Sequence, residues 1–310
     1  MEYKDRLLGC LWGAALGDAL GAPYEFRYGR MPYKDQITNE STSLSLGQVT
    51  DDTEMMLALA QSLRENDKYV RETAIRAYCD WATSDVPDIG ANTRSLFLHP
   101  KGHLDQVKAY EQSYKLFVSD QPEEKWSQSN GCLMRVMATA LLPREQAAWL
   151  QDCMLSNPHS ICQEAVDFYM CMLHSCLDGT FQFSFVPKFD CNNQAMTEAI
   201  KREKRDLSKS RGWVVHGLYC AIRCYTTGFN FVDGMRWVIG EHLDSDTDTN
   251  ACIAGAILGA KLGYKRMMEC PITRENVRLI KECKSNRPDK YHPKHIDEIV
   301  EHFTSKNVIN

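Results

Sequence analysis

The residues best suited to chemistry stand in two short acidic clusters, each at the head of an apolar, helix-like stretch. The first cluster spans residues 50–54 (TDDTE), and the second spans residues 244–250 (DSDTDTN). Asp and Thr are favoured at helix starts, where they satisfy free backbone N–H groups and the helix dipole. Capping accounts for one or two carboxylates per helix start, whereas three aspartates within five residues repel one another. A bound cation that holds them together is the alternative to simple capping.

The type of cation follows from the ligand atoms. The alternating aspartates of the second cluster do not fit an EF-hand loop, which requires Gly at position six and Glu at position twelve. Counted from Asp244, those positions hold Thr249 and Gly255. Oxygen ligands from two helix starts suit a hard cation such as Mg²⁺ or Mn²⁺, and this many carboxylates favours two ions over one.

Three single residues near helix ends have both a structural and a functional interpretation. Glu25 follows a proline on a loop, where its carboxylate is either an ordinary exposed acid or a metal ligand. Asp18 lies within the first helical stretch and is expected to satisfy a neighbouring backbone or helix end. His159 stands at a helix start, where a capping role explains it without a ligand.

Two polar loops that contain glycine, residues 87–94 (PDIGANTR) and 129–135 (SNGCLMR), precede helical segments. Backbone N–H groups at such helix starts bind phosphate well, and Arg135 would add positive charge. Taken alone, each loop is more typical of an ordinary turn followed by a helix cap.

The elements that position these residues are helical, since Met55, Leu59 and Leu63 repeat at i, i+4 and i+8. Two glycine-rich stripes recur every four residues: Gly9, Gly13, Gly17 and Gly21, and then Ala251, Gly255, Gly259 and Gly263. Glycine destabilises a helix by about 1 kcal/mol relative to alanine at each position. A whole stripe of glycines is therefore expected only where close packing stabilises the helix in compensation. We predict two buried helices whose smooth faces allow close backbone contact, including contact with each other.

Strand signals are few and no second domain is indicated. Residues 179–186 alternate with period two before Pro187, which predicts an extended connector or a lone edge strand. Residues 187–211 are the most linker-like, and the charged run at 201–211 is more typical of a solvated helix face than of a site for an acidic partner. The sequence therefore predicts one all-α domain over residues 1–310, with a possible insertion at about 179–211.

Composition excludes several classes of protein. The chain of 310 residues is 44% hydrophobic and 25% charged, which excludes a disordered, collagen-like or coiled-coil chain. A net charge of −5 gives no electrostatic reason to expect nucleic-acid binding. No apolar run approaches the ~18–20 residues of a membrane span, and the first residues do not resemble a signal peptide. The 13 cysteines form no C-x-x-C pair, which suits buried thiols in a reducing cytosol, so a cytoplasmic location is expected.

Taken together and in order, five segments resemble the ADP-ribosylglycohydrolase family, of the dinitrogenase-reductase-activating type. They read GCLWGAALGDALGAPYEF, TDDTEM, DIGANTR, SNGCLMR and DTDTNACIAGAILGA, and they run from residue 9 to about 263. The resemblance implies a compact orthogonal all-α bundle with a binuclear Mg²⁺ or Mn²⁺ centre. It also implies hydrolysis of the glycosidic bond between ADP-ribose and a protein side chain (arginine or serine) or a small acceptor.

The resemblance also assigns roles to individual positions. The implied metal ligands are Thr50, Asp51, Asp52, Asp246, Asp248 and Thr249, with Glu25 at the same site. The loop along the ribose is matched by Asp88, Gly90 and Thr93. The loop near the diphosphate is matched by Asn130, Gly131, Met134 and Arg135, and His159 matches a position close to the ligand. For catalysis, Asp51, Asp52 or Glu25 would accept a proton from water and Asp88 would help the leaving group.

The sequence departs from the family pattern in three places, one of which is Pro158, where relatives often have a small polar residue before the histidine. Asp244-Ser245 replaces the usual Gly-Gly, which implies a reshaped or strained turn if those glycines have positive φ. Residues 179–211 have no clear counterpart and are interpreted as a specificity insertion over the cleft.

Three functions remain open from the sequence. The first is the metal-dependent glycohydrolase, acting as a monomer on an ADP-ribosylated protein or a small molecule that contains ADP-ribose, with no nucleic-acid or membrane partner. The second is a catalytically inactive ADP-ribose-binding or structural relative on the same scaffold. The third is a metal-dependent nucleotide hydrolase that cleaves phosphate bonds.

Overall fold

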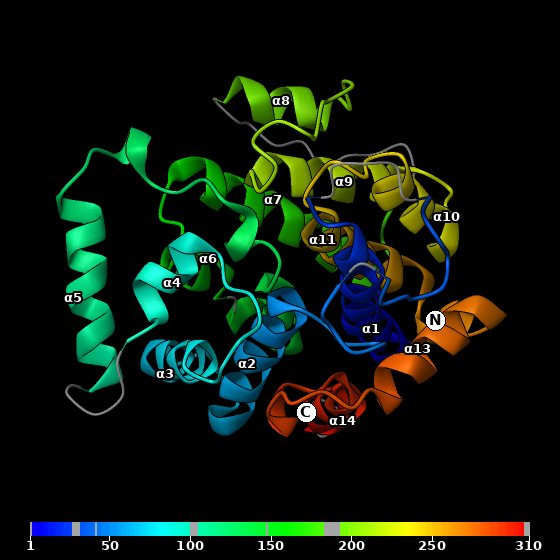
Figure 1. Ribbon diagram of the computed structural model, residues 1–310, viewed down its shortest axis with the longest axis horizontal. Helices are drawn as coiled ribbons and strands as arrows, with labels where there is room; N and C mark the ends of the chain where they lie inside the picture. The colour runs from blue at the N-terminus through cyan, green and yellow to red at the C-terminus, as the bar shows by residue number, and fades with distance from the viewer. Residues whose placement is uncertain are drawn as a thin grey trace.

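The computed structural model describes residues 2–26, 32–40, 42–99, 105–146, 148–182 and 193–306 of the 310-residue chain. These residues form α-helices joined by loops and short helical turns (Figure 1). In this part of the chain, the one β-type contact is an isolated antiparallel bridge between Ser129 and Trp213. The predicted all-α class is therefore confirmed. Within the alternating stretch, residues 179–182 are not a strand, and residues 183–186 lie outside the described residues.

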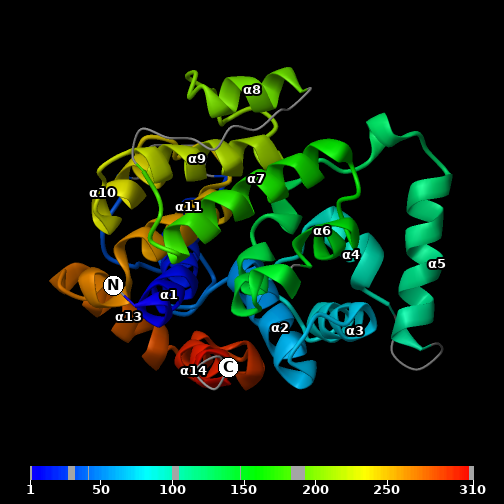
Figure 2. The ribbon, with the colours of Figure 1, turned by 180° about the vertical axis from the view of Figure 1, so that it is seen from behind.

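Two helices lie side by side at the centre, α1 (Tyr3–Gly21) and α11 (Thr247–Leu262), as both views show (Figures 1 and 2). Their facing surfaces are the two glycine stripes. A Cβ atom at Gly13 would lie 2.2 Å from the carbonyl oxygen of Gly255, which is closer than any real contact. The prediction of two buried helices in close backbone contact is confirmed. Contact between the two backbones supplies the packing stabilisation that offsets the low helix propensity of the glycines.

Gly263 departs from its predicted place in the second stripe. It has φ 81° and follows the last residue of α11, so it ends the helix. Glycine tolerates this backbone conformation at little cost, whereas other residues do not.

The remaining helices surround the central pair. Packed against α1 or α11 are α2 (Asp51–Asn66), α7 (Ser160–Leu177), α9 (Val214–Thr226), α10 (Phe231–Met235), α12 (Tyr264–Met267), α13 (Pro271–Glu282) and α14 (Ile296–Lys306). At the end of the molecule beyond α2 lie α3 (Arg71–Ala82), α4 (Ala91–Phe97), α5 (Gln106–Ser119) and α6 (Trp149–Met154) (Figures 1 and 2). Buried apolar side chains from both groups form one continuous core.

Short helical turns complete the connections. They are η1 (Ala22–Tyr24), η2 (Glu123–Lys125), η3 (Asn130–Cys132), η4 (Val136–Leu141), η5 (Arg144–Gln146), the π-helical turn η6 (Arg236–Gly240), η7 (Asp289–Tyr291) and η8 (Pro293–His295). Helix α8 (Gln194–Ile200) belongs to the predicted insertion and stands on the outer surface beside α9 (Figures 1 and 2).

Two sequence expectations concern chemistry outside the site. The cysteines of the described residues carry free thiols, and most of them are buried, as predicted. Among the same residues, no helix combines the length and the apolar character that a membrane span requires.

Candidate functional site

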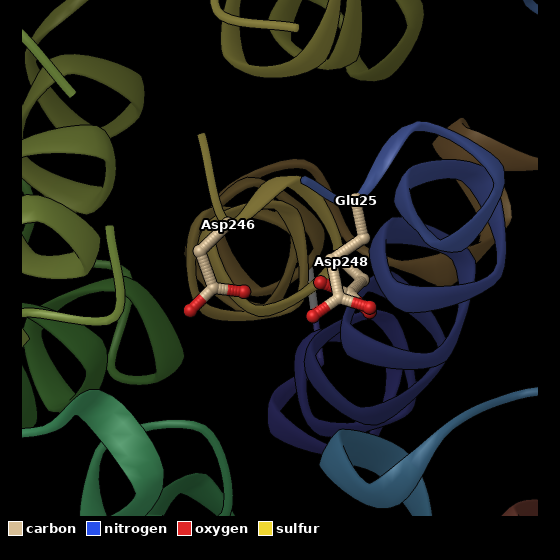
Figure 3. A group of neighbouring side chains, drawn as sticks. All are labelled: Glu25, Asp246 and Asp248. Carbon is tan, nitrogen blue, oxygen red and sulfur yellow. The ribbon is translucent and has the colours of Figure 1, made fainter. Parts of the chain in front are cut away.

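The acidic residues of both clusters meet where α2 and α11 begin. Asp246 is the N-cap of α11, Asp248 lies in its first turn, and Glu25 follows η1 at the end of α1. One carboxylate oxygen from each of these three residues lies within 4.8 Å of the other two (Figure 3). Asp246 and Asp248 are buried, and Glu25 is half-buried. Glu25 and Asp246, which are 221 positions apart in the chain, are thus brought together because the smooth faces of α1 and α11 align their ends.

The start of α2 is held at the same place by Asp18 of α1. Thr50 is the N-cap of α2, and its backbone N–H donates to the carboxylate of Asp18 at 3.1 Å. The backbone N–H of Thr53 donates to the same carboxylate at 3.0 Å, and the hydroxyls of both threonines also bond to it. Asp18 therefore caps α2 from a neighbouring helix, which confirms the expectation for this residue.

We expect Asp18→Ala to lower the free energy of unfolding by about 2–3 kcal/mol, because two buried N–H groups lose their acceptor. Burial raises the pKa of Asp18 to about 6, so the loss is smaller than the number of bonds alone implies. Urea unfolding measures the effect. Asp105→Ala is the matched control, since Asp105 caps exposed α5 through one bond to Val107 and should cost about 1 kcal/mol. Equal losses in the two variants would contradict this role for Asp18.

Electrostatics at the site are dominated by like charges. The pKa values of five carboxyls are raised, first by burial and then by neighbouring carboxylates: Glu25, Asp51, Asp52, Asp246 and Asp248. For Glu25 the pKa is raised to about 8. The main charged influences on Asp51, Asp52 and Asp248 are other acids, and no cationic side chain is among them. Such a cluster is costly unless protons or cations neutralise it.

One buried oxygen atom of the cluster is available to bind a cation. The Oδ2 atom of Asp52 lies 3.1 Å from the hydroxyl of Thr50, whereas its Oδ1 atom is buried and has no hydrogen-bond partner. An unsatisfied buried carboxylate oxygen beside further carboxylates is the donor set of a hard, oxygen-preferring divalent cation. The residues present therefore fit Mg²⁺ or Mn²⁺.

The predicted ribose loop lies next to this cluster. The carboxylate of Asp88 accepts the N–H of Ile89 at 2.8 Å and contributes to the raised pKa values of Asp51 and Glu25. Gly90 is the exposed N-cap of α4, and Thr93 is buried in its first turn. Both Asp88 and Gly90 are exposed, so this loop is free to meet a ligand.

The predicted diphosphate loop is joined to the cluster through Asn130. Its side-chain amide donates to Oδ2 of Asp246 at 2.8 Å, and its backbone N–H donates to the carbonyl of Gly212 at 2.8 Å. A Cβ atom at Gly131 would lie 3.8 Å from the hydroxyl of Thr93, so the two loops are neighbours. Met134 is buried in the core.

Arg135 does not add positive charge to this loop surface, contrary to the sequence interpretation. Its side chain is fully buried and forms an ion pair with Asp152, with Nε 3.0 Å from Oδ2. Nη1 donates to the carbonyl of Gly131 at 2.7 Å, and Nη2 donates to the hydroxyl of Ser156 at 3.0 Å. The guanidinium thus holds the loop from within. The partner aspartate lies 17 residues away and carries no motif, so the sequence did not reveal the pair.

His159 is a helix cap, as its structural interpretation predicts. Its Nδ1 atom accepts the backbone N–H of Ile161 at the start of α7. The Nε2 atom lies 3.0 Å from the side-chain nitrogen of Gln128, whose oxygen accepts the indole N–H of Trp213. The imidazole is half-buried and links α7 to the segment that precedes α9.

The Asp244-Ser245 departure is accommodated without backbone strain. Neither residue has a positive φ. Asp244 forms an ion pair with Arg211 at 2.7 Å, and the carbonyl of buried Ser245 accepts the N–H of Phe26 at 3.4 Å. The extra acid therefore turns away from the cluster toward a guanidinium.

Two residues near the site were missed in the sequence. Gly212 lies so close to the cluster that a Cβ atom there would be 3.4 Å from Oδ2 of Asp246. The buried side chain of Asn157 donates to the carbonyl of Ser129 at 3.2 Å and so supports the diphosphate loop. A lone glycine and a lone asparagine give no signal without the fold.

Comparison with known proteins gives a consistent result. The chain is 27% identical over 284 residues to the ADP-ribosylarginine hydrolase Tri1 of Pseudomonas putida, covering 86% of this chain and 73% of that protein. It is 25% identical over 279 residues to the ADP-ribosyl-[dinitrogen reductase] glycohydrolase of Rhodospirillum rubrum, covering 84% and 87%. A solved structure described as an ADP-ribosylglycohydrolase-related protein complex shares the fold, with a TM-score of 0.70, 20% identity and 98% coverage of both chains. The family model of the ADP-ribosylglycohydrolases matches residues 1–289, and the chain therefore belongs to the ADP-ribosylglycohydrolase family.

Proposed function

We propose that this protein hydrolyses the glycosidic bond between ADP-ribose and an acceptor, with two divalent cations in the acidic cluster. The observation that carries the proposal is the group of carboxylates at the starts of α2 and α11, with Oδ1 of Asp52 buried and unpartnered. An inactive descendant has no reason to keep repelling carboxylates together, because their burial destabilises the fold unless cations are bound.

The cations would be held by oxygen atoms at the two helix starts. The proposed ligands are Thr50, Asp51, Asp52, Asp246, Asp248 and Thr249. Mg²⁺ or Mn²⁺ bound there would bind the cis-diol of the distal ribose and stabilise negative charge as it develops. The amide of Asn130 fixes the orientation of Asp246 through their 2.8 Å hydrogen bond.

The remaining residues would move protons and orient the sugar. Water attacks the anomeric carbon of the ribose, the bond to the acceptor atom breaks, and its electron pair leaves with the acceptor. Glu25 takes the proton of the attacking water, with Asp51 or Asp52 as the alternative base. Asp88 assists the departing acceptor, and the loop of Gly90 and Thr93 lies along the ribose.

Arginine is the linkage to test first. The relatives from Pseudomonas putida and Serratia proteamaculans, at 27% and 26% identity, are both named ADP-ribosylarginine hydrolases. Serine linkages and small ADP-ribose conjugates use the same sugar and differ only in the acceptor, so the proposed site does not by itself discriminate among them.

The test is release of ADP-ribose from a mixed pool of arginine-modified and serine-modified proteins, with Mg²⁺, with Mn²⁺ and with a chelator. We expect metal-dependent release of intact ADP-ribose. The linkage that survives in the pool is the one the protein does not cleave, so the linkage that is lost identifies the acceptor. Mass analysis that finds AMP and ribose phosphate would instead establish cleavage of phosphate bonds. Tight binding of ADP-ribose without release from either linkage would establish the binding-protein alternative.

A further inference from the structure

A groove with a volume of about 970 Å³ lies between the predicted insertion and the loop that leads into the second acidic cluster. One wall is the segment 204–208, which follows α8, and the other is the segment 240–245, which follows η6. Tyr33 lines the groove as well, and its ring is in contact distance of Gly240. The apolar residues of the lining include Leu207 and Leu243.

The groove ends next to the acidic cluster. Ser245 is the last residue of its lining and is the chain neighbour of Asp246. The hydrogen bond from the N–H of Phe26 to the carbonyl of Ser245 joins that end to the loop of Glu25. A molecule bound in the groove would therefore lie beside the cluster, whose carboxylates are not part of the groove lining.

The helix that follows the proposed ribose loop and the helix that precedes one wall of the groove lie on different sides of the molecule. In both views α4 and α10 stand on opposite sides of the central pair α1 and α11 (Figures 1 and 2). The loop of Asp88 leads into α4, whereas the 240–245 wall follows α10 and η6. If ADP-ribose extends from the cluster toward α4, the acceptor side of the scissile bond is directed toward the groove.

Two segments singled out in the sequence line this groove. Residues 204–208 belong to the predicted insertion, and Asp244-Ser245 leads into the second acidic cluster. The ion pair between Arg211 and Asp244 joins the two segments, and the Arg211 guanidinium also lies 5.6 Å from the ring centre of Phe26. These segments thus form one surface beside the site.

The charges that remain available in the groove have opposite signs. Arg205 is paired with Glu198, and Asp206 is paired with Lys209. Lys204 and Glu241 are exposed, stand on opposite walls and form no ion pair with any described residue. His242 also lines the groove, where burial lowers its pKa, Glu241 raises it and Lys204 lowers it.

We infer that this groove binds an extended polypeptide segment of the modified protein, on the acceptor side of the bond that is cleaved. The segment places an acidic side chain toward Lys204 and a basic side chain toward Glu241, and its backbone covers the apolar floor. This inference rests on the proposed function, and it gives the protein a preference for the sequence around the modified residue. Small conjugates bypass the groove.

The test compares kcat/KM for an ADP-ribosylated protein with kcat/KM for ADP-ribose linked to the free amino acid of the same linkage. Ser208→Trp fills the groove, and Lys204→Glu or Glu241→Lys reverses one charge. We expect each variant to lower kcat/KM for the protein substrate by about tenfold, because recognition loses contact or gains repulsion. For the small substrate kcat/KM should stay within about twofold, since ADP-ribose recognition is untouched.

Lys201→Glu and Glu203→Lys are the matched controls, because they reverse exposed charges on the same segment outside the groove lining. Both should leave both substrates unaffected. The groove assignment would be overturned if the ratio of kcat/KM for the protein substrate to kcat/KM for the small substrate were the same in all five variants as in the wild type. Parallel losses on both substrates in the groove variants would have the same meaning. Wild-type protein that cleaves neither substrate would overturn the proposed function instead.

Discussion

The double variant Asp51→Asn, Asp248→Asn is expected to lose hydrolysis by about 1,000-fold or more, because cations at such a centre contribute several kcal/mol to the reaction. One substitution lies at the start of α2 and the other at the start of α11, so both halves of the proposed centre are weakened. Stabilisation by metal should disappear as well. At a concentration 100 times Kd, a ligand that binds only the folded state adds about 2.7 kcal/mol, and the variant should show none of it.

In the absence of metal, the double variant should be more stable than the wild type. The pKa values of both carboxyls are raised in the folded protein, so keeping them ionised at neutral pH destabilises the fold. An amide removes that charge. The chelated variant should therefore have a higher Tm than the chelated wild type, although it is inactive.

Thermal unfolding with Mg²⁺ and with a chelator, together with the release assay, measures both effects. Asp85→Asn, Asp120→Asn is the matched control, since both aspartates are exposed and distant in sequence from the clusters. The control should keep activity and the response to metal. Full activity in the Asp51→Asn, Asp248→Asn protein would refute the metal assignment.

Gly13→Val is expected to abolish folding, and Gly13→Ala should cost about 3 kcal/mol or more, at the upper end of overpacking effects. The new Cβ would lie 2.2 Å from the backbone oxygen of Gly255, and a backbone atom cannot swing aside as a side chain does. Helix propensity alone favours alanine over glycine by about 1 kcal/mol, so the expected sign is the reverse of the local preference.

Urea unfolding of Gly13→Ala and the yield of soluble Gly13→Val measure the cost of separating α1 from α11. Gly228→Ala is the control, because a Cβ atom there would meet nothing within 4 Å. Its free energy of unfolding should change by less than about 1 kcal/mol. A Gly13→Ala protein as stable as the wild type would show that α1 and α11 can move apart without lowering the free energy of unfolding.

The parts of the fold that were predictable are those encoded by local repetition. The four-residue spacing of glycines identified α1 and α11 and their contact, because only glycine permits backbones to approach so closely. The same spacing explains why two distant acidic clusters share a site. Once α1 and α11 are aligned, Glu25 follows the end of one helix and Asp246 begins the other.

The parts that were not predictable depend on partners distant in sequence. From the sequence, Arg135 is interpreted as a phosphate-binding residue. In the structure its guanidinium forms a buried ion pair with Asp152 in the core. The turn at Asp244-Ser245 reads as strained until the backbone is seen without positive φ and Arg211 beside the acid. Neither partner stands in a motif, so only the tertiary structure reveals them. The roles of the individual site residues stay predictions.

The contact between α1 and α11 also sets the order in which the chain can fold. Most residues of helix α1 are buried, and the helix loses its packing surface if α11 is absent, yet α11 is synthesised more than 200 residues later. During translation α1 therefore has no α11 to pack against until nearly the whole chain has left the ribosome, and until then it is either exposed or bound by a chaperone. Contacts of such large sequence separation slow folding, because a long loop must close before they form. A ribosome-bound chain truncated before residue 247 should therefore stay sensitive to protease throughout, however complete its other helices are.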